Sequence, residues 1–135
     1  MSGGKRDWDD AERETVRARL GALVAGLPGV ELQDGHGHTG YALKGKRFAW
    51  YLVDHHGDGR LALWAKAPAG EQQALVGGYP ERYFVPPYLG PSGWVGACLD
   101  VASRPDWDEV AGLLEQAWRM NAGKRAVAAY DAKNP

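Results

Sequence analysis

The chain has 135 residues, of which 44% are hydrophobic and 24% charged, and its formal net charge is −1. This length fits one domain, and this composition is typical of a soluble globular protein. The near-neutral charge excludes a general attraction to nucleic acid, and the single cysteine, Cys98, excludes an internal disulfide and a zinc site made of cysteines.

The two ends of the sequence differ from the segment between them. Residues 1–7 are predicted to be a flexible lead and residues 131–135 a tail, so the domain occupies residues 8–130. The start of the chain has no apolar signal core, and no apolar run approaches the about 20 residues of a membrane span. With one cysteine in the chain, these features predict a cytoplasmic protein.

The first predicted element is an amphipathic helix at about 9–26. Apolar residues recur at spacings of three and four, which places them in one stripe on a helix. The stripe consists of Val16, Leu20, Leu23, Val24 and Leu27. Gly26, Pro28 and Gly29 end the helix.

The pattern then changes to a period of two, which predicts strands. VELQD (30–34) is a short strand candidate, and GHGHTG after it is interpreted as a connector. KRFAWYLV (46–53) and RLALWAK (60–66) are joined by a Gly/Asp-rich loop and are typical of an antiparallel hairpin. A short helix is expected in PAGEQQALVGG, with the last strand in GWVGACLDV.

Alternation within the strands predicts which side chains share a face of the sheet. In the first hairpin strand, one face is expected to carry Phe48, Trp50 and Leu52, and the other Ala49, Tyr51 and Val53. In the last strand, one face is expected to carry Val95, Ala97, Leu99 and Val101.

A second amphipathic helix is predicted at about 106–121. Asp106 and Glu109 form an approximate capping box at its start, and a short terminal helix is expected in KRAVAAY. The order of helix, antiparallel strands and helix predicts an α+β fold, with the N- and C-terminal helices packed on one face of an antiparallel sheet. The other face must be exposed to solvent, paired with a partner or covered by loops, and we expect the functional surface there.

Four histidines lie in two pairs, His36 with His38 and His55 with His56. Three nearby aspartates complete a candidate set of transition-metal ligands: Asp34, Asp54 and Asp58. Adjacent residues of an extended chain point in opposite directions, and Asp, Gly and His suit turns. We therefore interpret both segments as solvent-exposed turns and expect no metal site.

The sequence offers no catalytic constellation. Cys98 lies in an apolar strand and is expected to be a small buried hydrophobe. Ser92 lies in GPSG, which is not the G-x-S-x-G of a nucleophile elbow. GHGHTG precedes a strand and so lacks the helix N-terminus of a phosphate loop. We expect a binding protein without a cofactor rather than an enzyme.

Basic residues alternate with aromatic rings in residues 40–104, which hold seven Lys/Arg against five Asp/Glu, a balance of +2. Such a mixture is typical of surfaces that bind phosphates and stack bases. The candidate nucleic-acid contacts are Lys44, Lys46, Arg47, Arg60 and Lys66, with Trp64 as the stacking ring. In the alternative interpretation the rings belong to the core, and Lys46 and Arg47 protect an edge strand.

The segment YFVPPYLGPSGWVG (83–96) combines prolines, glycines and rings. Its prolines and glycines are explained by a rigid corner that delivers the chain to the last strand. A corner does not require three rings, so Tyr83, Tyr88 and Trp94 are a candidate pocket for a small aromatic ligand. Packing of these rings on the last helix is the alternative.

Taken in order, four segments resemble the MmcQ/YjbR family: KRFAWYLV, LALWAKAPAGEQQALV, PERYFVPPYLGPSGWVGACLD and DWDEVAGLLEQAWRMNAGKRAVAAYD. The resemblance covers nearly the whole chain, as far as Tyr130. It implies a frataxin-like "double wing" fold, with helices on one face of an antiparallel sheet. Members are commonly labelled DNA-binding or of unknown function, and one namesake comes from a mitomycin biosynthesis cluster, so DNA binding and a metabolite or drug-resistance role are both implied. Ala117–Trp118 stands where many relatives carry Ser-Tyr.

Overall fold

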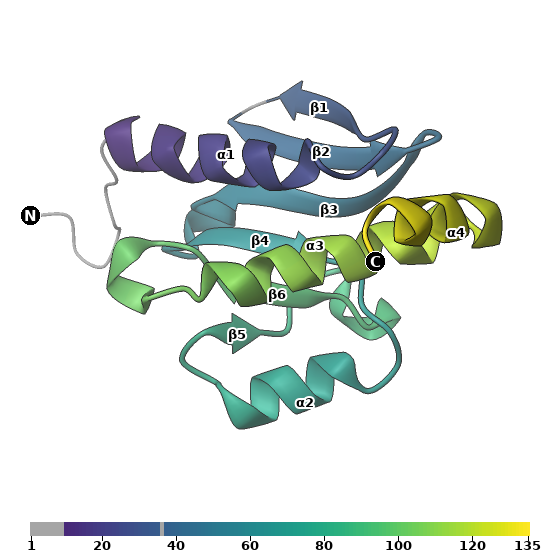
Figure 1. The fold of residues 1–135 in the computed structure, drawn as a ribbon. Coiled ribbons are helices and arrows are strands. Elements are labelled where there is room, and N and C mark those ends of the chain that lie inside the picture. Colours follow the sequence, from purple (N-terminus) through teal and green to yellow (C-terminus); the bar gives the residue numbers. More distant parts are fainter. Residues whose placement is uncertain (1–9, 36) are drawn as a thin grey trace, which may run out of the picture.

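The computed structural model describes residues 10–35 and 37–135. Within them, helices cover one face of a six-stranded antiparallel sheet with the strand order β1-β2-β3-β4-β6-β5 (Figure 1). The strands are β1 (Glu31–Gly35), β2 (His38–Leu43), β3 (Lys46–Val53), β4 (Leu61–Ala65), β5 (Tyr83–Phe84) and β6 (Val95–Cys98). The helices are α1 (Asp10–Val24), α2 (Glu71–Gly78), α3 (Trp107–Ala122) and α4 (Lys124–Lys133). This arrangement confirms the predicted α+β fold.

Helices α1 and α3 lie side by side on the same face of the sheet, and α2 packs at the edge formed by β5 and β6 (Figure 1). Asp106 caps α3 as predicted, because its carboxylate accepts hydrogen bonds from the N–H groups of Asp108 at 3.0 Å and Glu109 at 3.3 Å. Among the helices that the structure describes, none has the length and apolarity that crossing a bilayer requires.

The main core lies between these helices and the sheet. Trp118 is its largest fully buried side chain, and its indole N–H donates to the carbonyl of Pro28 at 2.9 Å. This bond ties the middle of α3 to the loop after α1. Ala117 is also fully buried, so the pair that departs from the Ser-Tyr of many relatives is part of the core.

A β-bulge in β3 changes the predicted alternation. Tyr41 pairs with Ala49 but Ala42 pairs with Arg47, which leaves Phe48 as the extra residue of the bulged strand. Phe48 is fully buried in the main core, whereas Trp50 belongs to a cluster on the opposite face. The prediction that Phe48 shares a face with Trp50 was therefore wrong, because one inserted residue inverts the alternation.

The last strand is shorter than predicted. The final ladder bond runs from the N–H of Leu99 to the carbonyl of Leu61 at 2.7 Å, after which Asp100 starts a 3₁₀ turn at Val101–Ser103. Val101 lies in this turn and is 76% exposed, so the prediction that it shares a strand face with Val95 was wrong. The side chain of Ser103 donates to the Asp100 carboxylate at 2.8 Å, which stabilises the turn that removes Val101 from the sheet.

A second, smaller cluster lies on the face that α1 and α3 leave uncovered, termed here the helix-free face. Its members are Trp50, Leu52, Ala62, Trp64, Phe84, Leu89 and Trp94. The strands supply five of these side chains, and the Pro-rich segment that turns back over the sheet supplies Leu89 and Trp94. The Pro-rich segment therefore covers part of the helix-free face, and a cleft can form between this segment and the strands.

Candidate functional site

A row of side chains crosses five strands of the helix-free face at one level. Successive cross-strand partners are Gly40 with Trp50, Trp50 with Trp64, Trp64 with Gly96, and Gly96 with Phe84. Directly opposed residues of antiparallel strands project from the same face. The three rings of Trp50, Trp64 and Phe84, termed here the aromatic row, therefore form one surface carried by β3, β4 and β5.

The two glycines of this row lack side chains, and this leaves space for the rings of Trp50 and Phe84 to lie close to the backbone. A Cβ atom on Gly96 would lie 2.4 Å from Cζ of Phe84, and one on Gly40 would lie 3.3 Å from Trp50 and 3.0 Å from Nε of Arg47. The Phe84 ring thus lies directly on the β6 backbone, at a distance that only glycine permits.

An arginine lies over each outer ring of the aromatic row. The guanidinium carbon of Arg47 is 4.2 Å from the ring centroid of Trp50, and that of Arg60 is 3.9 Å from the ring centroid of Phe84. Both distances are those of cation–π contacts. The row is therefore apolar in the middle and carries a positive charge at each end.

A cavity of about 270 Å³ opens on the aromatic row. Its floor comes from the strands, and its walls come from the loop before β4 and from the Pro-rich segment. The lining residues are His38, Trp50, Leu52, His55, Trp64, Tyr88 and Leu89. We term this cavity the aromatic cleft.

His55 forms one wall of the aromatic cleft from a 3₁₀ turn at His55–Gly57. Its imidazole meets Trp64 edge to face, with centroids 4.9 Å apart and planes at 80°, and lies 5.8 Å from the ring of His38. Burial, together with the neighbouring His56, lowers the pKa of His55 below its ordinary value. A neutral imidazole is therefore favoured in this wall.

Two buried nitrogens in the aromatic cleft make no hydrogen bond with the part of the chain that the structure describes. They are Nε2 of His55 and the indole Nε1 of Trp64. A buried polar atom without a partner costs about 1–3 kcal/mol, so such atoms are rare in folded proteins and often lie at functional sites. Both nitrogens belong to residues that line the same cavity, so polar groups without partners among the described residues are buried in its walls.

Tyr88 stands at the mouth of the aromatic cleft in an unusual conformation. Its φ is +64° and 75% of its surface is exposed. The left-handed region is unfavourable for a bulky residue by roughly 1–2 kcal/mol. Hydrogen bonds on either side fix this turn, from Leu89 N–H to the Pro87 carbonyl and from Gly90 N–H to the Pro86 carbonyl. Strain held in this way is a common feature of ligand-binding loops.

The structure divides the three rings predicted to form a pocket. Tyr88 lines the aromatic cleft, and Trp94 is buried in the small cluster beside it. Tyr83 lies on the helix-covered face, because it precedes Phe84 in β5 and adjacent strand residues point in opposite directions. Its hydroxyl donates to Glu109 of α3, and it lines a separate cavity of about 280 Å³ between α2, β5 and α3.

The Pro-rich segment forms a corner held by α2. The side-chain amide of Gln72 donates to the carbonyl of Gly90 at 2.9 Å and to the carbonyl of Trp94 at 2.6 Å. Gln72 is itself buried, so these bonds are shielded from solvent. The corner therefore positions both the wall of the aromatic cleft and the start of β6.

The structure also divides the predicted nucleic-acid contacts. Lys44 and Lys46 are exposed at the turn between β2 and β3, and Arg47 and Arg60 lie on the helix-free face. Lys66 donates instead to the side chain of Asn121 in α3 at 2.7 Å, which directs its charge toward the helix-covered face. Trp64, the predicted stacking ring, is 3% exposed and lies in the floor of the aromatic cleft.

The histidine segments differ from their interpretation as exposed turns. His38 is a half-buried residue of β2, and His55 is half-buried in the aromatic cleft, whereas His56 is exposed. The prediction therefore holds for His56 and was wrong for His38 and His55, while His36 lies outside the described residues.

The three candidate aspartates accept hydrogen bonds from protein groups. Asp34 accepts from Arg17 at 2.8 Å and from Thr39 at 2.7 Å. Asp54 accepts from the N–H of Gly59 at 2.8 Å, and Asp58 from the N–H of Arg60 at 3.0 Å. Across residues 10–35 and 37–135, the side chains of His, Cys, Asp and Glu form no group of three that could hold a metal ion.

A larger groove of about 490 Å³ lies between α1 and the segment from Leu99 to Trp107. Its two charged side chains are engaged: the Arg19 guanidinium lies 4.6 Å from the Trp107 ring centroid, and Glu12 accepts from the N–H of Val101 at 3.0 Å. The smaller aromatic cleft is the stronger candidate site, because two of its lining residues hold buried nitrogens with no partner among the residues that the structure describes.

Sequence reasoning missed five lining residues of the aromatic cleft: His38, Trp50, Leu52, His55 and Leu89. The hairpin register was a usable signal for one of them. A hairpin whose loop spans residues 54–60 pairs Trp50 with Trp64, so the stacking ring proposed at Trp64 implied a second ring beside it. No local pattern indicates that His55 or Leu89 folds onto this row.

Comparison with known families finds a match to the YjbR family model over residues 25–120. This range includes every lining residue of the aromatic cleft and leaves α1 and α4 outside it. Neither the curated proteins nor the solved structures contain a match to the chain. The family match spans more than half of the sequence, so the chain belongs to the YjbR family.

Proposed function

We propose that this protein binds a planar aromatic small molecule in the aromatic cleft. The observation that carries the proposal is that the rings of Trp50, Trp64, His55 and Tyr88 line one cavity. Two of these rings also hold buried nitrogens that have no hydrogen-bond partner within residues 10–35 and 37–135. Rings supply a flat surface on which an aromatic ligand can stack.

The size of the cleft limits the ligand. A volume of about 270 Å³ lies just below the roughly 300–1,000 Å³ of typical small-molecule sites. A ligand with one or two fused rings suits this space, with one ring over Trp64 and an edge toward His55.

We propose binding without chemical transformation. Burial raises the pKa of Cys98, the one thiol of the chain, and so keeps it protonated and weakly nucleophilic. The same residue is not among those that line the aromatic cleft. The proposed role is therefore that of a carrier, sensor or sequestering protein for an aromatic compound.

The test is a titration with quinoline and 2-naphthol, followed by the indole N–H signals in a ¹H–¹⁵N NMR spectrum. Binding should shift the Trp64 indole signal, because that group lies in the floor of the cleft. Tyr88→Ala should weaken binding by about fivefold, near 1 kcal/mol of stacking.

Tyr79→Ala is the matched control, since Tyr79 is also an exposed tyrosine, at 45%, and contacts Tyr83 and Arg82 outside the cleft. The proposal fails if neither compound binds at millimolar concentration, or if both substitutions weaken binding equally.

A second candidate function, single-stranded nucleic acid binding, is favoured by the turn between β2 and β3. Lys44, Lys46 and Arg47 are exposed there, and Arg47 lies over Trp50 at the edge of the aromatic cleft. Cations next to a stacking ring are the combination that single strands require. The net charge of −1 and the orientation of Lys66 toward α3 make this candidate the weaker one.

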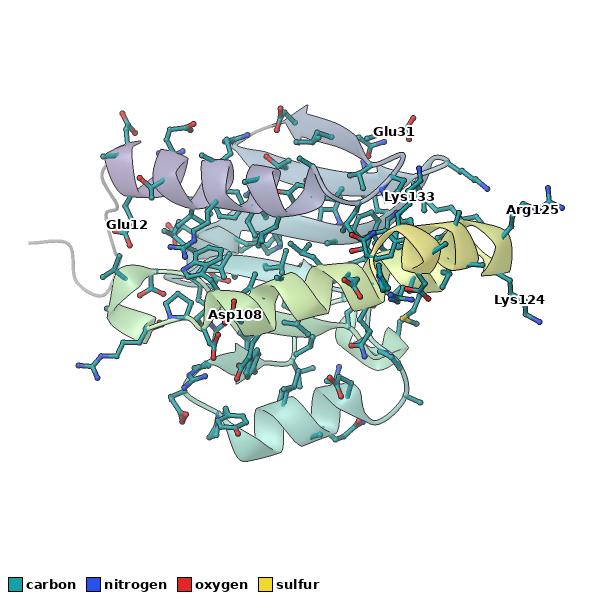
Figure 2. All side chains as sticks on the ribbon, viewed as in Figure 1. Glu12, Glu31, Asp108, Lys124, Arg125 and Lys133 are labelled. Atoms are coloured by element: carbon teal, nitrogen blue, oxygen red, sulfur yellow. The ribbon has the colours of Figure 1, made fainter. Side chains whose placement is uncertain are left out.

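This candidate is tested with a short oligothymidine at about 50 mM and 200 mM salt, where phosphate contacts predict a steep loss of affinity. Arg47→Glu should abolish binding, and Arg125→Glu should not, because Arg125 projects from α4 on the helix-covered side (Figure 2). Affinity that is independent of salt, or equally sensitive to both substitutions, contradicts the second candidate.

A further inference from the structure

A second cavity, of about 320 Å³, adjoins the aromatic cleft. It is lined by His55, His56, Asp58, Arg60, Pro87 and Tyr88. His55 and Tyr88 line both cavities, so these two side chains form a shared wall between an apolar compartment and a polar one.

Arg60 is the charged group of this polar compartment that is best placed to meet a ligand. Its guanidinium carbon lies 3.9 Å from the ring centroid of Phe84, and its side chain also interacts with the Cys98 thiol. Within the described residues it forms no ion pair with a carboxylate. A guanidinium carries five N–H donors, so these contacts leave others able to donate.

Asp58 supplies the carboxylate among the lining residues of this compartment. Asp58 accepts a hydrogen bond from the backbone N–H of Arg60 at 3.0 Å, and this bond holds the loop before β4. The imidazoles of His55 and His56 border the same space and can each donate a hydrogen bond. Arg60, His55 and His56 therefore supply N–H donors to this compartment, which also contains the Asp58 carboxylate.

Arg47 is less well placed for an anion joined to a bound ring. It lies over Trp50 at 4.2 Å, but it lines neither of the two cavities that meet at Tyr88. Arg60 lines the compartment beyond Tyr88 and Arg47 does not. A ligand that extends out of the aromatic cleft past Tyr88 therefore reaches Arg60 and not Arg47.

We propose that the ligand is a planar aromatic acid, with its ring on the aromatic row and its carboxylate at the guanidinium of Arg60. This inference rests on the proposed function and adds to it the chemical class of the ligand. Tyr88, at the shared wall, covers the bond between ring and carboxylate.

The experiment compares 2-naphthoate with 2-naphthamide, which have nearly the same shape and differ in charge. The natural chain should bind the naphthoate about tenfold more tightly, as a charge-assisted hydrogen bond predicts. Arg60→Gln should remove this preference and leave the affinity for the naphthamide unchanged. Arg60→Lys should restore part of the preference, because it returns the charge without the planar fork.

Arg47→Gln is the matched control, since it removes the other ring-stacked arginine and should keep the preference. Near-ultraviolet circular dichroism checks that each variant retains its packing. If the natural chain binds both compounds equally well, the ligand is not selected for a carboxylate and this inference is wrong, whereas the proposed binding of aromatic molecules is still supported. A preference that persists in Arg60→Gln and is lost in Arg47→Gln overturns the assignment to Arg60. If neither compound binds, the proposed function and this inference both fail.

Discussion

Trp50 of β3 and Trp64 of β4 are directly opposed in the antiparallel ladder, so their indoles lie together on the helix-free face. Both belong to central strands, and each strand is paired on both sides. A ligand surface carried by such strands is held more precisely than one built only on loops. The Pro-rich corner, which hydrogen bonds from Gln72 hold in place, contributes Tyr88 and Leu89 to the same surface.

Gly96→Ala should destabilise the protein through the Phe84 ring. The new Cβ atom would lie 2.4 Å from Cζ of Phe84, which forces that ring and the stacked Arg60 to move. Overpacking of this kind costs about 1–3 kcal/mol, to be measured by urea unfolding. Gly112→Ala in α3 is the control, because its Cβ meets open space and should stabilise the helix by about 0.5–1 kcal/mol. If Gly96→Ala unfolds at the same urea concentration as the natural chain, the close contact with Phe84 is ruled out.

Tyr88→Asn should separate stability from binding. Asn tolerates a φ of +64° better than Tyr, and the exposed ring contributes little packing, so the free energy of unfolding should rise by up to about 1 kcal/mol. The same change removes one wall of the aromatic cleft and should weaken the binding of 2-naphthol. Thermal unfolding and NMR titration measure the two effects, and a variant that binds as well as the natural chain would show that Tyr88 has no role in the cleft.

Tyr83→Phe should affect stability alone. The substitution removes the hydroxyl that donates to Glu109 and links β5 to α3, at a loss of about 1–2 kcal/mol. Aromatic ligands should bind unchanged, because Tyr83 lies on the helix-covered face. Tyr130→Phe is the control: its hydroxyl donates to Glu115 at 3.0 Å near the surface, and its loss should be smaller. Weaker ligand binding in Tyr83→Phe would place Tyr83 at the ligand after all.

The free energy of unfolding should fall as the pH is lowered through about 6.5, the ordinary pKa of histidine. The folded state holds the pKa of His55 below that value, so the unfolded state takes up its proton first and is favoured by acid. His55→Gln should show a shallower decrease between about pH 7.5 and pH 5.5 in urea unfolding series. Parallel curves for the variant and the natural chain would mean that His55 is not protected from protonation in the folded state.

The sequence predicted the elements that depend on local pattern. The apolar stripe through Leu20 located α1 to within two residues at each end, and the period of two located the hairpin of β3 and β4. The capping residue Asp106 fixed the start of α3, because its role needs only the next three residues. These signals act within one element, so a single sequence is enough to detect them.

The aromatic cleft depends on contacts that no local pattern records. His55 and Tyr88 are 33 positions apart and line one cavity only because two loops fold onto the same face of the sheet. Tyr83 does not lie with Tyr88 and Trp94. It belongs to the two-residue strand β5, and the pairing of β5 with β6 determines which face of the sheet its side chain occupies. Composition identified the rings, and tertiary pairing determined which of them meet.

The bulge at Phe48 has a consequence for the charge at the rim of the aromatic cleft. Arg47 and Trp50 are three positions apart, an odd number that would place them on opposite faces of a regular strand. One extra residue restores their parity and lets the cation stack on the ring. Deleting Phe48 would leave Arg47 and Trp50 two positions apart in a regular strand, still on one face, and would remove a fully buried ring from the main core. The bulge therefore adds a core side chain to β3 without changing the face on which the charge at the rim of the site lies.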